Sequence, residues 1–265
     1  MYEYHPSFIV PDDENVKIWR YFDIPKFLWL IEKRSLYFSR CDLLGDPFEG
    51  SLPSAPDQIT FEPLFKKITA ERLKLDENDI ELEPSPSIVD NWRKCCYICS
   101  FHMNDHESAA LWSMYTKAKQ GIAIQSTFKK LVDSLKNYDI NPVFIGSVKY
   151  IDRRVETIDV MQNMFLPILH KVKSFEYERE IRAVIHNPRE VYSLPKTGSV
   201  APSPIEVCEK CGGINVPIDL DCLIEHAYLA PTTKPWIKEL LTSLMAKQGV
   251  RIQLEQSSLD DSPIF

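Results

Sequence analysis

Two glutamates two residues apart, Glu178 and Glu180, are the residues of this chain whose types and spacing most favour chemistry. The apolar run that follows, residues 181–185, is typical of a β-strand, and alternate residues of a strand share a face. We therefore expect Glu178, Glu180 and Arg182 on one side of that strand. Neighbouring carboxylates repel each other unless a cation lies over them. Two interpretations are open: Arg179 and Arg182 close an ion network, or the acids receive a cationic ligand.

The composition is that of an ordinary globular protein. The chain has 265 residues, of which 44% are hydrophobic and 26% charged, with a net charge of −7; this length can bury a sizeable core. The negative charge argues against a general nucleic-acid binder, although a local basic groove stays open. The N-terminal segment does not have the pattern of a signal peptide, and the apolar run 27–31 is too short to cross a bilayer. We expect a cytoplasmic protein that does not associate with membranes.

Seven cysteines include two pairs with CxxC spacing. Cys208 and Cys211 precede two glycines and are spaced as in a zinc knuckle. Cys96 and Cys99 fall in an apolar stretch typical of a buried strand, so their side chains should point to opposite faces. A structural zinc at Cys208 and Cys211 is one expectation, and ordinary buried or loop thiols are the other.

Helical and strand patterns alternate irregularly along the chain, which favours an α+β fold with a mainly antiparallel or mixed sheet flanked by helices. We expect one domain over residues 1–265, with a helical and acidic insertion at about 57–92 and a loop insertion at about 187–213. Residues 1–17 should form a loose polar arm. Strands are predicted at 18–22, 35–39, 95–101, 121–126, 144–150, 181–185, 214–220, 223–229 and 251–256. Helices are predicted at 25–33, 61–75, 128–135, 160–173 and 234–247, and from a cap at Asp105 to residue 118.

An ordered set of short motifs resembles the bacterial domain-of-unknown-function family 2971. The motifs, which span residues 18–257, are Leu36-Tyr37-Phe38-Ser39, Asp46-Pro47-Phe48-Glu49, Cys99-Ser100-Phe101, Leu111-Trp112-Ser113-Met114-Tyr115, Gly121-Ile122-Ala123-Ile124, Val148-Lys149-Tyr150, Lys173, residues 175–182, Leu229-Ala230-Pro231 and Ser257. Gly45 departs from the family pattern, which usually has asparagine before the Asp-Pro-Phe-Glu motif. The family label supplies no activity.

A second resemblance is to the ADP-ribosyltransferase superfamily, whose motif order matches Arg20 in a first strand, Ser39 in a second, and Glu178 and Glu180 at a late one. It implies a split sheet and an enzyme that cleaves NAD. Glu180 would hydrogen-bond the nicotinamide ribose and stabilise an oxocarbenium-like centre, and Glu178 would orient or deprotonate the acceptor. Arg20 would clamp the pyrophosphate, and Ser39 would hold a ribose or amide. The acceptor would be a protein or a nucleic acid, and a toxin or phage-defence role would fit.

Trp112 and Tyr115 lie three residues apart on a predicted helix and are therefore adjacent. Such a pair packs in a core or stacks a nicotinamide or adenine ring. With Arg20, Ser39 and Arg182 they complete the candidate NAD-binding set.

Two further interpretations compete with NAD cleavage. One is a non-catalytic binding or regulatory module, in which Glu178, Glu180 and Arg182 form a structural ion network. The other is a metal-dependent phosphodiesterase, for which the candidate residues are His102, His106, Asp46 and Glu49. The motif that contains Asp46 also has a simpler interpretation, a turn that places Phe48 in the core. The sequence contains no Gly-rich phosphate-binding motif, so dinucleotide-fold and P-loop proteins are poor matches.

Overall fold

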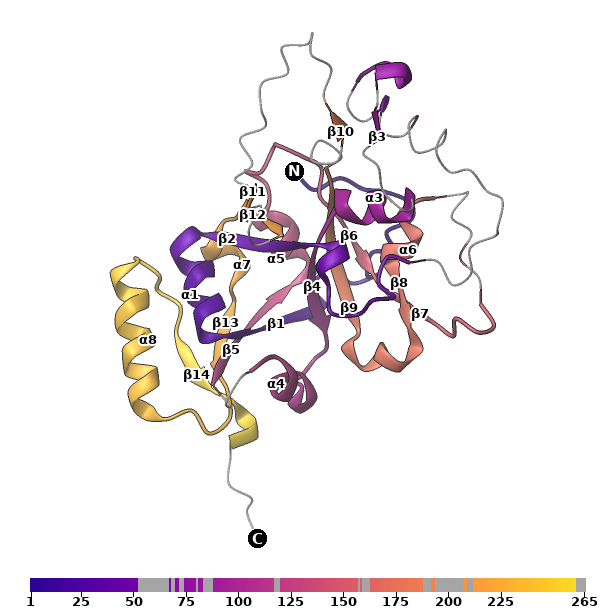
Figure 1. Cartoon of the computed structure of the whole chain (residues 1–265). Coiled ribbons are helices and arrows are strands. Elements are labelled where there is room, and N and C mark those ends of the chain that lie inside the picture. Colours follow the sequence, from indigo (N-terminus) through magenta and orange to yellow (C-terminus); the bar gives the residue numbers. More distant parts are fainter. Residues whose placement is uncertain are drawn as a thin grey trace.

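The computed structural model describes residues 1–51, 67, 70–71, 74–79, 81–82, 88–116, 120–156, 158, 163–187, 192–193, 207–208 and 212–260. Over these residues the chain has the predicted α+β fold, with a large, mostly antiparallel sheet and helices around it (Figure 1). The sheet strands are β1 (Lys17–Asp23), β2 (Ser35–Arg40), β4 (Cys96–Met103), β5 (Gly121–Thr127), β6 (Phe144–Ser147), β9 (Glu180–His186), β11 (Val207–Cys208), β12 (Gly213–Pro217), β13 (His226–Leu229) and β14 (Leu254–Gln256).

The path through the sheet is β11-β12-β2-β4-β1-β5-β13-β14, and β9 joins it beside β4 with β6 on its outer side. Within this sheet β13 and β14 run parallel, which makes the sheet mixed. Two short ladders lie apart from it: β7 (Lys149–Ile151) pairs in parallel with β8 (His170–Val172), and β3 (Glu81–Leu82) pairs with β10 (Tyr192–Ser193).

The described helices are α1 (Ile24–Lys33), α3 (Ile88–Cys95), α4 (Ala109–Tyr115), α5 (Phe128–Ser134), α6 (Leu166–Leu169), α7 (Leu220–Leu223) and α8 (Pro235–Lys247). Helix α1 shows why such elements form where they do. Asp23 caps its first turn by accepting a hydrogen bond from the Lys26 amide, Pro25 occupies the first turn, and Arg34 ends it in a left-handed conformation. These are the preferred residue types or conformations at those positions.

The sheet is forked at β4. On one edge of β4, residues 97–98 pair with β2 and residues 102–103 pair with β1, so β1 and β2 share this edge at opposite ends. The two strands diverge between these ladders (Figure 1). The other edge of β4 pairs with β9 from Cys96 to His102 without a break. β4 therefore joins two parts of the sheet, one that contains β2 and one that contains β1.

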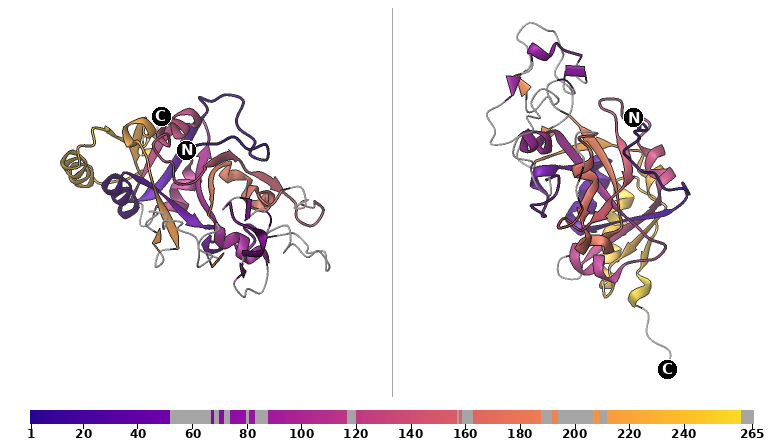
Figure 2. Two further views of the ribbon diagram at one scale, coloured as in Figure 1. Left: turned by 90° about the horizontal axis from the view of Figure 1, so that it is seen from above. Right: turned by 90° about the vertical axis from the view of Figure 1, so that its right-hand side faces the viewer.

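The two sides of the sheet differ in character. One side buries the main core against α1, α5 and α8; α1 and α8 lie side by side at one end of the molecule (Figure 2). The other side carries two smaller apolar clusters, one under α3 and α6 and one under α4. On this second side β4 and β9 also present Ser100, His102, Glu180 and Arg182, because these residues alternate with the core residues Cys99, Phe101, Ile181 and Ala183. Polar and ionisable groups are thus collected here.

Several predicted elements differ from the structure. The N-terminal arm is not loose: Phe8 is buried, the Glu3 amide donates to the Val143 carbonyl, and the Ser147 amide donates to Ile9. The predicted helix 160–173 is reduced, over its described part, to the single turn α6, after which β8 begins. Ser108, not Asp105, caps α4. Most of the predicted helix 61–75 and of the insertions 57–92 and 187–213 lies outside the described residues.

Candidate functional site

Five ionisable residues whose side chains are at most 8% exposed form one ion network: Glu49, Lys171, Glu178, Glu180 and Arg182. The Lys171 Nζ lies 2.5 Å from Glu178 Oε2 and 2.8 Å from Glu180 Oε1. The Arg182 Nε donates to Glu180 Oε2 at 2.8 Å, and its Nη2 donates to Glu49. The network therefore contains three acids and two permanent cations.

The two predicted acids reach the network by different routes. Glu180 lies on β9 and shares a face with Arg182, as the alternation predicted. Glu178 is the last residue of a 3-10 turn, Lys173–Glu178, and the next residue, Arg179, has a φ of 40° that turns the chain into β9. Arg179 is exposed and donates to Asn104 instead of to the acids. The basic partners of the acids are therefore Arg182 and Lys171.

Glu49 enters from the turn formed by residues 46–49. The side chain of Asp46 accepts a hydrogen bond from the Phe48 amide at 2.9 Å, and its carbonyl accepts from the Glu49 amide at 3.0 Å. This turn leaves Phe48 59% exposed and Glu49 5% exposed. The prediction that Phe48 packs in the core is wrong, because the partner that decides the orientation is Arg182, far away in sequence.

The local charges give the two neighbouring acids, Glu178 and Glu180, very different pKa values. Burial opposes ionisation of Glu180, but Arg182 and Lys171 outweigh it and hold the pKa of Glu180 well below its ordinary value. Burial and a hydrogen bond with Glu180 raise the pKa of Glu178 to about 7, against the attraction of Lys171. Near neutral pH the pair therefore shares a proton, with Glu180 ionised and Glu178 able to give or take it.

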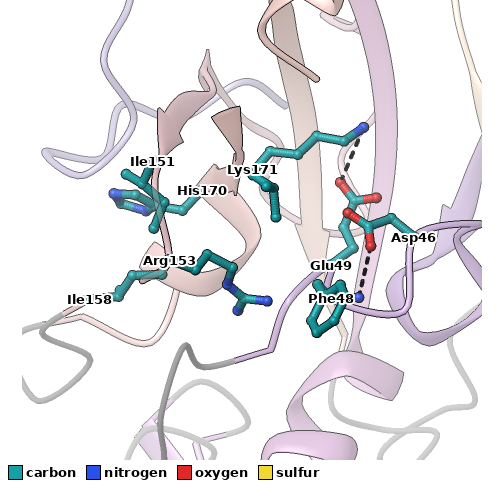
Figure 3. A pocket seen from close by; sticks show the side chains of 9 residues that line it. Asp46, Phe48, Glu49, Ile151, Arg153, Ile158, His170 and Lys171 are labelled. Atoms are coloured by element: carbon teal, nitrogen blue, oxygen red, sulfur yellow. Dashed lines mark hydrogen bonds and ion pairs between the residues drawn. The ribbon is translucent and has the colours of Figure 1, made fainter. Parts of the chain in front are cut away.

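A hollow adjoins the network on one side (Figure 3). It encloses about 220 Å³ of empty space, part of it open to solvent, and its lining includes Glu49 and Lys171 beside Asp46, Phe48 and Arg153. The space is too narrow for a water molecule as the side chains now lie, so the hollow is not a preformed ligand site.

Arg20 occupies the fork of the sheet. Its Nη1 donates to the Ser100 carbonyl at 2.5 Å, and its guanidinium lies 5.5 Å from the ring centres of both Phe22 and Phe101. Ser100 falls between the two ladders on that edge of β4. The guanidinium therefore donates a hydrogen bond to a β4 carbonyl that lies between the ladders with β1 and β2. This gives Arg20 a structural role.

The aromatic pair on α4 is divided between core and site. Trp112 is buried, packs edge-on against Tyr21 at 5.0 Å, and donates its Nε1 to Glu107 at 2.9 Å. Tyr115 is 48% exposed. Trp112 is thus held as a core residue, while about half of Tyr115 is open to solvent.

The electrostatics of Tyr115 show how near it lies to the network. Burial of its hydroxyl, followed by the charges of Glu178 and Glu180, raises the pKa of Tyr115 to about 12, and Lys171 and Arg20 act in the opposite direction. Tyr115 therefore lies within electrostatic range of the acid pair and of Arg20, whose guanidinium contacts Phe22 and Phe101 of the main core.

Ser39 does not join this group. It pairs with Ile98 on β4, and Ile98 pairs with Val184 on β9. Val184 is four residues beyond Glu180, and Ser39 is two strands away from β9, which gives a backbone separation of ~16 Å from Glu180 for ordinary strand spacings.

The residues proposed for metal binding are also dispersed. His102 is buried on β4, whereas His106 is exposed. The described part of the chain contains no group of three or more His, Cys, Asp or Glu side chains placed to hold a metal ion. Cys96 and Cys99 are buried free thiols in different core clusters, on opposite faces as predicted. The side chain of Cys208 and all of Cys211 lie outside the described residues, so the zinc knuckle stays a prediction.

Sequence reasoning missed Lys171, which completes the pairing of both acids. It lies on β8, inside the segment predicted to be a helix, and the sequence carries no signal for the short parallel ladder with β7. Tyr150, on β7, was noted only for its family resemblance, yet its hydroxyl accepts a hydrogen bond from the Glu180 amide at 2.8 Å.

None of the described helices has the length and apolar character needed to cross a bilayer.

Comparison with known proteins identifies one family. No curated protein and no solved structure matches the chain significantly. Residues 111–183, which run from α4 through Lys171, Glu178, Glu180 and Arg182, match the family model described as protein of unknown function (DUF2971), and this confirms the resemblance to that family.

Proposed function

We propose that this protein is an enzyme that cleaves the nicotinamide–ribose bond of NAD in the manner of an ADP-ribosyltransferase, with Glu180 as a fixed anion and Glu178 as the acid–base group. One observation carries the proposal: the buried carboxyls of Glu178 and Glu180 are bridged by Lys171 Nζ at 2.5 and 2.8 Å. Their surroundings shift the two pKa values in opposite directions, up for Glu178 and down for Glu180. Pairs of this kind supply the acid and base assignments of many active sites.

The two carboxyls suit the two steps of the reaction. An anion held in place stabilises the positive charge that develops on the ribose as nicotinamide leaves. A carboxyl that titrates near neutral pH is well matched to removing a proton from an acceptor. The ammonium of Lys171 is the cation that now pairs with both acids, and it also faces the Phe175 ring at 4.6 Å. A cationic substrate would compete with Lys171 for the acids.

The rest of the proposed site consists of Tyr115, which offers a half-exposed ring, and Arg20, whose positive charge opposes the rise in the pKa of Tyr115. Arg182 positions Glu180 through their hydrogen bond and does not itself bind NAD in this proposal. The acceptor is a protein or nucleic-acid group. A role as a toxin or phage-defence effector belongs to the same proposal, because transfer or loss of ADP-ribose would harm a cell.

The test is release of nicotinamide from NAD by the purified protein. We expect wild-type protein to release it, Glu180→Gln and Glu180→Ala to lose release, and Glu176→Ala, an exposed acid of the same turn, to match the wild type. Glu180→Gln is included because it keeps the shape of the side chain and leaves fewer groups of the network unpaired. Circular dichroism confirms that each variant is folded. Normal turnover in folded Glu180→Gln and Glu180→Ala would rule the assignment out.

A specific observation favours a second candidate, a non-catalytic binding or regulatory module. Every acid of the network already has a buried basic partner, as a purely structural ion network requires. Calorimetry with NAD separates the candidates, since saturable heat supports the enzyme. Absence of both heat and nicotinamide release would leave the binding module as the better proposal.

A further inference from the structure

His102 is a buried histidine on the side of the sheet that carries the acid pair. It lies on β4 directly between Trp19 of β1 and Glu180 of β9 in the strand register. Its side chain is 5% exposed, and the ring of Tyr21 lies 6.5 Å away between centres. His102 thus belongs to the wall between α4 and the ion network.

The protonation of His102 follows from one hydrogen bond. Its Nδ1 lies 2.6 Å from the backbone carbonyl of Glu178, an acceptor that can bond only to a protonated nitrogen. Burial, followed by the charge of Arg179, lowers the pKa of His102, so the ring is neutral near pH 7 and Nε2 carries a lone pair. This Nε2 is buried and has no hydrogen-bond partner among the described residues.

A buried acceptor without a donor is rare in folded proteins and calls for an explanation. The same histidine fixes the turn that places the Glu178 carboxyl, since its Nδ1 bonds to the carbonyl of that residue. The unused nitrogen is therefore held in a defined position with respect to the acids. A group that donates to it would be held in position as well.

We propose that His102 is a substrate-binding residue whose Nε2 accepts a hydrogen bond from a hydroxyl group of a ribose held beside Glu178 and Glu180. The identity of the sugar rests on the NAD cleavage proposed above, whereas the acceptor role rests on His102 alone.

The variant His102→Asn separates binding from folding. The amide N–H of asparagine can take the place of Nδ1–H and keep the bond to the Glu178 carbonyl, while the acceptor at Nε2 is removed. His106→Asn is the matched control, because His106 is exposed on the following loop. The probes are NAD, ADP-ribose, and two NAD analogues that lack either the 2′- or the 3′-hydroxyl of the nicotinamide ribose, each titrated by calorimetry.

We expect the wild type and His106→Asn to bind NAD and ADP-ribose equally well, and His102→Asn to bind both about tenfold more weakly. One deoxy analogue should lose a similar factor with the wild type and nothing further with His102→Asn. That coupling is the signature of a direct hydrogen bond, which a structural role for His102 would not produce.

The outcomes distinguish this inference from the proposed function. Nicotinamide release with unchanged binding by His102→Asn, or equal loss with every analogue, overturns the role of His102 and leaves NAD cleavage standing. Binding of ADP-ribose that depends on His102 without nicotinamide release supports the role and overturns cleavage. A wild type that binds neither probe overturns both.

A measurement on the wild type covers the case in which His102→Asn does not fold. The ¹⁵N resonance of His102 Nε2 should have the position of an unprotonated nitrogen and shift when saturating ADP-ribose is added. An unchanged resonance in the presence of bound ADP-ribose overturns the inference.

Discussion

Glu178 and Glu180 show how position decides the chemistry of identical side chains. Glu180 shares a strand face with Arg182 and receives donors from both Arg182 and Lys171. Glu178 shares Lys171 and then has Glu180 itself as its next neighbour. Glu180 is therefore stabilised as an anion, and Glu178 is the acid that more readily holds a proton.

The raised pKa of Glu178 predicts a stability that depends on pH. Because the folded pKa of about 7 lies above the ordinary value of 4.5, the folded state binds the proton more tightly than the unfolded state. Its contribution is complete below pH ~4.5 and is lost as the pH rises through ~7. The unfolding free energy of wild type minus that of Glu178→Gln should fall between pH 5 and 8, as measured by urea denaturation.

The difference between the two proteins is the quantity to measure, because other groups titrate in the same range. His5, His102 and His170 have lowered pKa values, mainly through burial, and their contributions are lost as the pH falls. These contributions cancel in the comparison if Glu178→Gln leaves their surroundings intact. A difference that is flat or rises over pH 5 to 8 would contradict the assignment of the proton to Glu178.

Arg182 is the residue on which the network depends most. It is 1% exposed and pairs with Glu180 and Glu49 while donating to the Ile168 carbonyl at 2.7 Å. Removing one member of a buried ion pair typically costs about 3–5 kcal/mol, because the remaining charge is left without a partner. We expect Arg182→Met to lose unfolding free energy of that order in chemical denaturation.

Arg179→Met is the matched control for this prediction. Arg179 is exposed and contacts Asn104, and surface substitutions of this kind usually change stability by less than about 0.5 kcal/mol. Equal stability of the two variants would mean that the buried network contributes nothing specific.

At the scale of elements, patterns that a single strand or helix carries were predictable. The alternation of β9, the helix at α1 and the opposite faces of Cys96 and Cys99 all follow from local spacing. The helix predicted at 160–173 was wrong beyond Leu169, where residues 170–172 form β8, because a short segment of this kind suits a helix or a strand equally well. Lys171 was missed for the same reason, because its position depends on the pairing of β8 with β7.

The start of β5 provides a test of how closely the elements pack. A Cβ added at Gly121 would lie 2.5 Å from the Phe22 carbonyl oxygen and 2.3 Å from Thr116 Cγ2, closer than real contacts allow. Gly121→Ala should therefore lose about 1–3 kcal/mol of unfolding free energy, as overpacked sites do. Gly45→Ala is the control, because nothing lies within 4 Å of a Cβ there. A stable Gly121→Ala would show that β5 can move away from β1.

At the scale of the whole molecule, the site depends on contacts between distant segments. Arg182 meets Glu49 across 133 positions of sequence, and Arg20 meets Ser100 across 80. No local pattern predicts which strands share an edge of β4, so the fork could not be derived from the residues alone. The same long range places Ser39 on β2, one prong of the fork, away from the acids on β9.

The fork raises the question of whether the two prongs fold as one unit. The main core is continuous across them: it joins Leu36 and Phe38 of β2 to Ile122 and Ile124 of β5. Such a shared core favours a single cooperative transition. We therefore expect urea unfolding curves followed by tryptophan fluorescence and by far-ultraviolet circular dichroism to coincide for the wild type.

Arg20→Met tests the cause of this cooperativity. The substitution removes the donor to the Ser100 carbonyl at the fork, which should lower the unfolding free energy by about 1–3 kcal/mol. Because the continuous core remains, the two probes should still report one transition, shifted to lower urea. Two separate transitions in this variant would show that the guanidinium in the fork, rather than the shared core, couples the two halves of the sheet.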